Sequence, residues 1–330
     1  MEFFVSMNSL AIGTTDTIPT FSVGGSRYDL TTYGGRLRHF VSIIDPRLLF
    51  VDEETLSRSQ SLIDSFSKGR LSTMSDAVNQ ELWQAKRIID SAMNHATGEI
   101  IHPLARMCAF VPASLPITLG MLTMTSTPAV LGLQWVNQSY NALFNYSHRS
   151  QAGTDTSQVF KAYALATGTS CALALGLSKF AGHIRPPWLI STLAVMAAGS
   201  ANVAFTRANE TTQGIDVSNN KGEVLGKSQI AGKYAVGYTI LSRSILLPIP
   251  IMVLPGPMSQ YISNAWFRNG IGRRAKLLVD VSCILASQAI ALPVCIAAFP
   301  TTLKFKRSEL EPSFNIDGNS DEIVYVQKGV

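Results

Sequence analysis

Long uncharged apolar stretches alternate with short charged segments over the C-terminal two-thirds of the chain. Residues 107–147 contain no Asp, Glu, Lys or Arg, and as one helix they would measure about 60 Å. Because the hydrocarbon core of a bilayer is about 30 Å thick, this stretch is expected to turn, at Thr125-Ser126-Thr127-Pro128. Residues 107–127 form the expected first span. Residues 129–146 form either a second span or a helix lying partly in the interface.

Four further apolar segments follow, at residues 162–178, 188–206, 236–254 and 281–300. The first two are rich in Ala, Gly, Ser and Thr, which let membrane helices approach one another closely. Buried strands of soluble α/β enzymes are also apolar, but they are short, so that alternative explains single runs and not the whole set. The pattern predicts a bundle of about five transmembrane helices plus one amphipathic or additional spanning helix.

Charge is unevenly distributed, and this predicts three parts. Residues 1–106 are rich in charged side chains, whereas beyond them the charges gather in short clusters between apolar runs. Only 15% of all residues are charged and the mean hydropathy is +0.19, while typical soluble proteins are about 25% charged. We expect an all-α integral membrane protein with a soluble, mostly helical N-terminal region (1–106), a membrane helix bundle (107–303) and a polar C-terminal tail (304–330).

The net charge of +5 does not indicate nucleic-acid binding, because the basic residues form no stripe with interleaved aromatics. Basic residues beside apolar spans suit anionic lipid headgroups, so the expected partner is the lipid bilayer. All four cysteines lie within apolar runs and show no metal-ligand spacing. We expect no metal and no cofactor, and because no catalytic motif occurs, we expect no enzyme.

One helical segment is rich in amides. Asn137, Asn141 and Asn145 recur every four residues, and each step advances about 40° around a helix, so the three amides share one face. Uncharged donors and acceptors at membrane depth need partners in protein, water or solute. This face either holds the bundle together through hydrogen bonds between helices or forms the wall of a path for a small polar solute.

Arg243 interrupts the apolar segment 236–254, which also contains two prolines. An arginine at the centre of a span costs about 3 kcal/mol on the insertion scale. The segment is therefore expected to pack inside the bundle and not against lipid. The guanidinium either holds a solute carboxylate, serves as a structural counter-ion to Asp280 or Glu210, or extends toward the membrane surface.

Arg207 and Glu210 lie three residues apart just after the segment 188–206. As a pair they most simply form a salt bridge at a helix end or anchor a loop. Asn202 lies on the segment before them and is a weaker candidate for the polar path. The candidate substrate-binding residues are therefore Asn137, Asn141, Asn145, Asn202, Arg207 and Arg243.

Several blocks of the sequence resemble the sideroflexins, a family of mitochondrial inner-membrane proteins. They are Tyr33-Gly-Gly-Arg-Leu-Arg-His-Phe40 with Asp45-Pro-Arg47, the amide-rich block at 135–146, Arg207-Ala-Asn-Glu210 with Gly214-Ile215, and Tyr325-Val-Gln-Lys-Gly-Val330. Together they run through nearly the whole chain. The sequence departs from the family in one motif and at one further residue. Its usual His-Pro-Asp-Thr-Gly-Glu is replaced by Asn94-His-Ala-Thr-Gly-Glu99, and Gly199 stands where the family often has asparagine.

The resemblance implies a five-span protein of the mitochondrial inner membrane that transports amino acids, with serine as the expected solute. Serine is a zwitterion with a hydroxyl, so it needs a cation or helix N-terminus, acceptors for its ammonium group and an amide or hydroxyl for its side chain. Arg243 or Arg207, with the Asn137 face, supplies such a set. The N-terminus contains Glu2 and Asp16 and no arginine before Arg27, so no cleavable presequence is expected.

A second hypothesis is a membrane scaffold that assists other inner-membrane complexes, with residues 1–106 as its docking domain. Transport of tricarboxylates, an older interpretation of the family, is less attractive. A tri-anion needs several cations, and Arg243 is the only basic residue inside an expected span. Lys and Arg are nearly equally numerous in alternate loops, so the positive-inside rule predicts no orientation.

Overall fold

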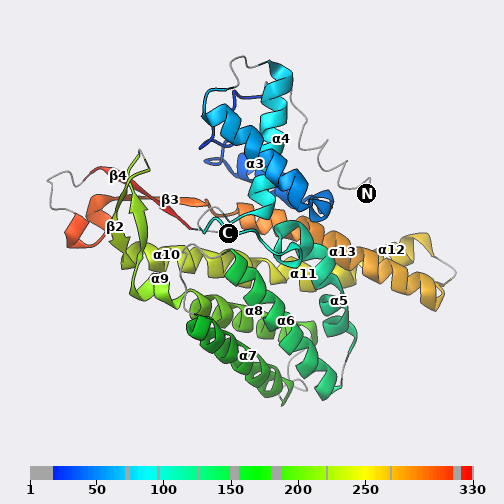
Figure 1. The fold of residues 1–330 in the computed structure, drawn as a ribbon. Helices are drawn as coiled ribbons and strands as arrows, with labels where there is room; N and C mark the ends of the chain where they lie inside the picture. Colours follow the sequence, from blue (N-terminus) through cyan, green and yellow to red (C-terminus); the bar gives the residue numbers. More distant parts are fainter. Residues whose placement is uncertain are drawn as a thin grey trace. The chain divides into compact units, whose positions relative to one another are not determined.

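The computed structural model describes residues 18–70, 75–94, 97–124, 126–148, 156–179, 187–220, 222–267, 270–314 and 321–328, mostly as helices (Figure 1). Contacts within the chain separate it into two compact units, Met1–Phe110 and Val111–Val330. The expected division into residues 1–106, 107–303 and 304–330 remains a prediction. Each unit contains its own cluster of buried apolar side chains.

The described part of the N-terminal unit contains α2 (Tyr33–Ile43), α3 (Glu53–Ser67) and α4 (Asp76–Ala92), with 3-10 turns at Pro46–Phe50, Pro103–Ala105 and Met107–Ala109. Each α-helix begins where the sequence supplies a capping side chain. Thr32, Asp52 and Ser75 accept a backbone N–H from the first turn of α2, α3 and α4, and such caps contribute about 1 kcal/mol each. Leu82 and Trp83 of α4 lie in the apolar cluster of this unit.

The C-terminal unit is built on long helices: α5 (Phe110–Thr123), α6 (Thr127–Ser147), α7 (Thr156–Lys179), α8 (Pro187–Thr206) and α13 (Arg273–Ala297). The break between α5 and α6 falls at the predicted turn, of which Thr125 lies outside the described residues. Pro128 occupies the first turn of α6, where a missing N–H costs nothing. The helices α6, α7 and α8 pack against one another (Figure 1).

One nearly continuous helical segment, Gln229–Trp266, runs for 38 residues. It comprises α10 (Gln229–Thr239), a π-helix (Ile240–Leu246), α11 (Pro248–Val253) and α12 (Pro255–Trp266). Pro248 and Pro250 offer no N–H to the carbonyls four residues earlier. The preceding turn widens, and the N–H of Leu247 donates to the carbonyl of Ser242 five residues back, at 3.2 Å. Arg243 lies in this widened turn.

A four-stranded antiparallel sheet corrects the prediction of an all-α fold. Its strands are β1 (Ile215–Ser218), β2 (Val224–Ser228), β3 (Thr302–Lys306) and β4 (Ile323–Gln327), in the order β2-β1-β4-β3. The connection after α8 and the C-terminal tail therefore pair with each other, although they are far apart in sequence. Most of β3 and all of β4 lie within residues 304–330, which were expected to form a polar tail.

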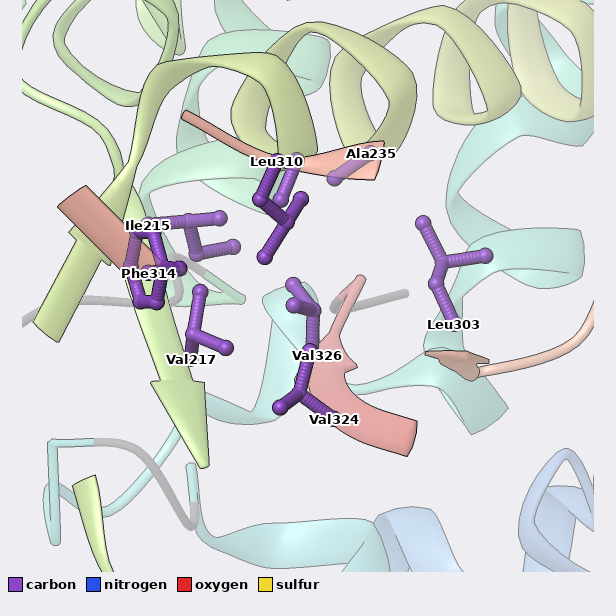
Figure 2. Packing of buried hydrophobic residues seen from close by; sticks show 9 residues of the cluster. Ile215, Val217, Ala235, Leu303, Leu310, Phe314, Val324 and Val326 are labelled. Atoms are coloured by element: carbon purple, nitrogen blue, oxygen red, sulfur yellow. The ribbon is translucent and has the colours of Figure 1, made fainter. Parts of the chain in front are cut away.

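The sheet has a small apolar core that fixes it to α10 (Figure 2). Alternate residues of the strands point inward, as the period of two in their sequences requires. The buried residues of this core are Ile215, Val217, Ala231, Ala235, Leu303, Leu310, Phe314, Val324 and Val326. Single strands of four or five residues carry too weak a pattern to be recognised alone, so pairing between distant segments decided this part of the fold.

Two helices in the described residues are long and apolar enough to cross a membrane, Gln229–Trp266 and Arg273–Ala297. Shorter apolar helices occupy Met107–Met121 and Thr192–Thr206. Helix α6 has 21 residues, but its amide side chains lower its mean hydropathy. It is therefore not among the two candidate spans. The count of about five spans remains a prediction, and so does the membrane crossing of residues 129–146.

Candidate functional site

A row of polar side chains lies inside the C-terminal unit and comes from α6, α7, α8 and the π-helix. We call this row the amide chain, and its members are Gln134, Gln138, Asn145, Ser170, Asn202 and Arg243. The exposed fractions of Gln138, Ser170 and Asn202 are 0%, 1% and 1%. Groups buried this deeply must find their hydrogen-bond partners within the protein.

Arg243 sets the direction of the amide chain. A guanidinium can only donate, and Arg243 Nη1 donates to Asn145 Oδ1 at 2.9 Å. With its oxygen facing the arginine, Asn145 turns its amide nitrogen to Asn202 Oδ1, at 2.8 Å. In turn, Asn202 Nδ2 donates to Gln138 Oε1 at 3.0 Å. One cation thus determines the orientation of three successive amides.

The amide chain continues from α6 to α7 and returns to α6. Gln138 Nε2 donates to Ser170 Oγ at 3.3 Å, and the Ser170 hydroxyl donates to Gln134 Oε1 at 3.0 Å. Every acceptor oxygen therefore faces toward the Arg243 end. The aligned dipoles present their negative ends to the cation and stabilise it where burial would otherwise be costly.

Arg243 is also placed by an aromatic ring and by close helix packing. Its guanidinium carbon lies 4.6 Å from the centroid of the Phe144 ring, a cation–π contact. A Cβ on Gly199 of α8 would lie 3.3 Å from Ser244 Cβ. The missing side chain at Gly199 therefore lets the π-helix approach α8 closely, on the helix that carries Asn202.

The structure brings together three of the predicted site residues, Asn145, Asn202 and Arg243. Asn137 and Asn141 are half-buried on α6, and their side chains make no hydrogen bond to any residue that the structure describes. The polar face of α6 therefore uses only one member of the predicted asparagine row.

Sequence reasoning missed Gln134, Gln138 and Ser170. The spacing of Gln134, Gln138 and Asn145 was a usable signal, since positions i, i+4 and i+11 lie within about 40° of one another on a helix. No comparable signal marked Ser170, because its helix is rich in small residues that serve close packing.

Arg207 lies outside the amide chain and holds the architecture together. Its Nε and Nη2 donate to the carboxylate of Glu210 at 2.8 and 2.5 Å. Its Nη1 donates to Thr239 Oγ1 at 2.6 Å, and Nη2 also donates to the Lys328 carbonyl at 2.7 Å. These bonds join the end of α8, α10 and the segment after β4. The expected pairing of Arg207 with Glu210 is confirmed, and every guanidinium nitrogen is already in use.

The two acids considered as counter-ions for Arg243 have other partners. Glu210 forms the ion pair with Arg207. Asp280 accepts hydrogen bonds from Lys276 Nζ, at 2.6 Å, and from the Ser259 hydroxyl. The contacts with Asn145 and Phe144 place Arg243 against α6 instead.

The segment before the first expected span forms a tight turn. The Asn94 N–H donates to the Glu99 carbonyl at 2.9 Å, and Gly98 has a φ of 71°, which suits glycine. His95 and Ala96 lie outside the described residues. Among the residues that are described, no three His, Cys, Asp or Glu side chains are grouped so that they could hold a metal ion.

Comparison with known proteins identifies the family. The family model "Sideroflexins" matches residues 22–330. The chain belongs to the sideroflexin family. Similar sideroflexins include "Sideroflexin" of Dictyostelium discoideum, which is 34% identical over 94% of this chain and 97% of its own length. "Sideroflexin-5" of Homo sapiens is 33% identical over 93% and 92%, and "Sideroflexin-3" of Mus musculus is 34% identical over 92% and 96%. No solved structure matches this chain.

Membership in the sideroflexins and the two long apolar helices together indicate a membrane protein. Within this sideroflexin, the motif that begins at Tyr33 has a structural basis. A Cβ at Gly35 would lie 1.9 Å from the Asp29 carbonyl oxygen, so only glycine fits. Buried Arg36 donates from Nη1 to the carbonyls of Leu30 and Thr31. The motif fixes the start of α2.

The Asp45-Pro-Arg47 motif of this sideroflexin centres on a buried carboxylate. Asp45 accepts hydrogen bonds from Arg47 Nε and Nη2 and from Arg87 Nη2, at 2.5–3.0 Å. Burial by itself raises the pKa of Asp45, but the hydrogen bonds and charges of the two arginines more than offset it and lower the pKa to about 2. The motif is a structural hub of the N-terminal unit.

Proposed function

We propose that this sideroflexin carries a small neutral amino acid, with serine as the best candidate, across the mitochondrial inner membrane. The observation that supports the proposal is the amide chain: uncharged donors and acceptors from three helices lead to one arginine inside an apolar bundle. A polar solute in hydrocarbon needs such partners at every step.

The chemistry of the amide chain matches that of a zwitterion. Arg243 offers two parallel N–H groups suited to a carboxylate. Side-chain oxygens of Asn145, Asn202 and Gln138 can accept from an ammonium group or a solute hydroxyl. Because Asn145 Oδ1 already occupies Arg243 Nη1, an arriving carboxylate would displace that bond and free the Asn145 carbonyl for the ammonium.

Transport of labelled serine into vesicles that contain the purified protein tests this proposal. Uptake should clearly exceed that of empty vesicles. Asn202→Leu should lower the uptake by about tenfold, because two buried hydrogen bonds to the solute path are lost. Asn264→Leu is the matched control, since this exposed amide lies on α12, outside the amide chain and outside the candidate residues. Uptake no faster than in empty vesicles contradicts the proposal.

The same variants distinguish a path from a purely structural network. If the amide chain only holds the helices together, Asn202→Leu lowers the thermal midpoint while properly folded molecules transport at the normal rate. If it lines the path, uptake per folded molecule falls, and Arg243→Gln should raise the serine concentration at half-maximal uptake, since the carboxylate loses its cation.

A scaffold without solute flux is the second candidate, and one observation favours it. Residues 1–110 form a compact unit with its own apolar cluster and ion-pair hub, as a docking domain requires. Stable inner-membrane complexes recovered with the protein after crosslinking, together with absent serine flux, would favour this function over transport.

A further inference from the structure

The connection between the two candidate spans is a basic and aromatic tip. Helices α12 and α13 pack as an antiparallel hairpin (Figure 1). We call its end the hairpin tip and define it by Tyr261, Trp266, Arg273 and Arg274. As the connection between two candidate spans, the tip would emerge at one membrane surface, near the lipid headgroups.

The charged residues in and around the hairpin tip are nearly all basic. From residue 224 to residue 279 the sequence contains no Asp or Glu, whereas Arg268, Arg273, Arg274 and Lys276 all fall within residues 268–276. Arg273 and Arg274 are exposed and make no ion pair or hydrogen bond with any described residue. Both lie in the first turn of α13, which contains no acid, so the positive end of the helix dipole adds to their charge.

The aromatic side chains of the tip are the most exposed large rings of the hairpin. Trp266 is 81% exposed and Tyr261 is 74% exposed. Amphipathic rings at the ends of spans are typical of the headgroup layer, where one part is apolar and the other meets water. Exposure of these rings beside unpaired cations therefore suits a lipid surface better than free solution.

The hairpin is fixed immediately behind the tip. Lys276 Nζ donates to Ser259 Oγ and to Asp280 Oδ1, both at 2.6 Å. The Ser259 hydroxyl also donates to Asp280. This clamp joins α12 to α13 and neutralises Lys276 with Asp280, so the net positive charge rests on Arg273 and Arg274.

We propose that the hairpin tip binds the phosphate headgroups of anionic phospholipids in the bilayer. Arg273 and Arg274 contact the phosphates, because guanidinium forks match phosphate oxygens. Trp266 and Tyr261 lie at the boundary between headgroups and acyl chains. The tip thereby anchors one end of both spans at an anionic membrane surface, independently of what solute the protein carries.

The test uses the full-length protein in a nonionic detergent, titrated with phosphatidylglycerol whose acyl chains carry bromine. Bromine quenches tryptophan fluorescence on contact, so Trp266 reports a lipid at the tip. Wild type should be quenched with a saturable midpoint, and Trp266→Phe should lose most of the saturable component. Brominated phosphatidylcholine should require a far higher concentration.

The decisive variant is Arg273→Gln with Arg274→Gln. Each cation near an anionic surface strengthens binding about fivefold, so the double change should raise the half-quenching concentration about 30-fold. Arg273→Lys with Arg274→Lys should retain most of the binding, since the charge is kept. Lys227→Gln with Lys304→Gln removes two exposed cations from the sheet and should leave the midpoint unchanged.

Equal midpoints for wild type and the Gln variant, or for the two lipids, would overturn the proposal. So would unchanged saturable quenching in Trp266→Phe, which would place the lipid elsewhere. Glycerol phosphate at millimolar concentration should not abolish the quenching, because it lacks acyl chains. If it does, the tip is a site for a soluble phosphate and not for a membrane lipid.

Discussion

The two units of this protein stabilise their buried polar groups in different ways. In the N-terminal unit, arginine side chains bind two kinds of acceptor. Arg87 donates to the carboxylate of Asp45, whereas Arg36 and Arg106 donate to backbone carbonyls. In the bundle, neutral amides follow one another and only one end of the row, Arg243, is charged. Where apolar surroundings make charge expensive, a row of aligned amides solvates a cation with groups that are cheaper to bury.

This difference predicts which changes each unit tolerates. Charged hydrogen bonds are stronger than neutral ones, and their removal leaves a charge behind. Neutral bonds between membrane helices average only about 0.6 kcal/mol. Disruption of the hub at Asp45 should therefore destabilise the protein more than disruption of the amide chain. A side chain that clashes with a neighbouring backbone should destabilise it more than either.

The largest expected effect comes from Gly232→Val in α10. A Cβ at this position would lie 1.9 Å from the Glu210 carbonyl oxygen, and a backbone atom cannot move aside cheaply. We expect the change to destabilise the C-terminal unit by about 3 kcal/mol or more. Thermal unfolding in detergent measures it. Gly237→Ala on the same helix meets nothing within 4 Å and should leave the midpoint almost unchanged.

The next effect concerns the ion-pair hub of the N-terminal unit. Asp45→Asn removes the charge that faces Arg47 and Arg87, and we expect a loss of about 2–3 kcal/mol, less than for a fully buried pair because Arg47 is exposed. Hydrogen exchange of the segment 42–51 should become faster. Asp52→Asn is the control, since asparagine caps a helix as well as aspartate. Equal protection in both variants would contradict a hub at Asp45.

Acid should weaken the same hub. The pKa of Asp45 is lowered in the folded protein to about 2 from its ordinary 3.8. Its stabilisation is therefore complete above pH 4 and is lost as the pH falls from about 4 to about 2. We expect about 2 kcal/mol to disappear over this range, seen as lower protection factors of residues 42–51 once the slower intrinsic exchange in acid is corrected for. The Asp45→Asn protein should show a much smaller change, and equal acid sensitivity would exclude this carboxyl as the cause.

The smallest expected effect is in the amide chain. Ser170→Ala removes the link between Gln138 and Gln134, and we expect a loss of about 1 kcal/mol. Ser200→Ala, at a serine of α8 whose hydroxyl donates to the Met196 carbonyl of its own helix, should cost less. Thermal midpoints of the two variants give the comparison. A loss for Ser170→Ala as large as that for Asp45→Asn would erase the contrast between the two units.

The sequence predicted helices well where apolar runs were long, and Pro128 marked the turn between the first two of them. The break after α5 and the Arg207–Glu210 pair could both be inferred locally. The sheet could not, because its strands have four or five residues and pair between the loop after α8 and the tail. Such a pattern is too short to be distinguished from an irregular loop.

The candidate site shows the same division. The residues 134–145 form one helix, so their polar character was visible in the sequence, and Arg243 was conspicuous in an apolar run. Which amides are joined was decided by packing: Asn202 comes from α8, Ser170 from α7, and the widened turn after α10 carries Arg243 to Asn145. Hydrogen-bond partners in different helices depend on how the helices pack, and only the tertiary structure determines that.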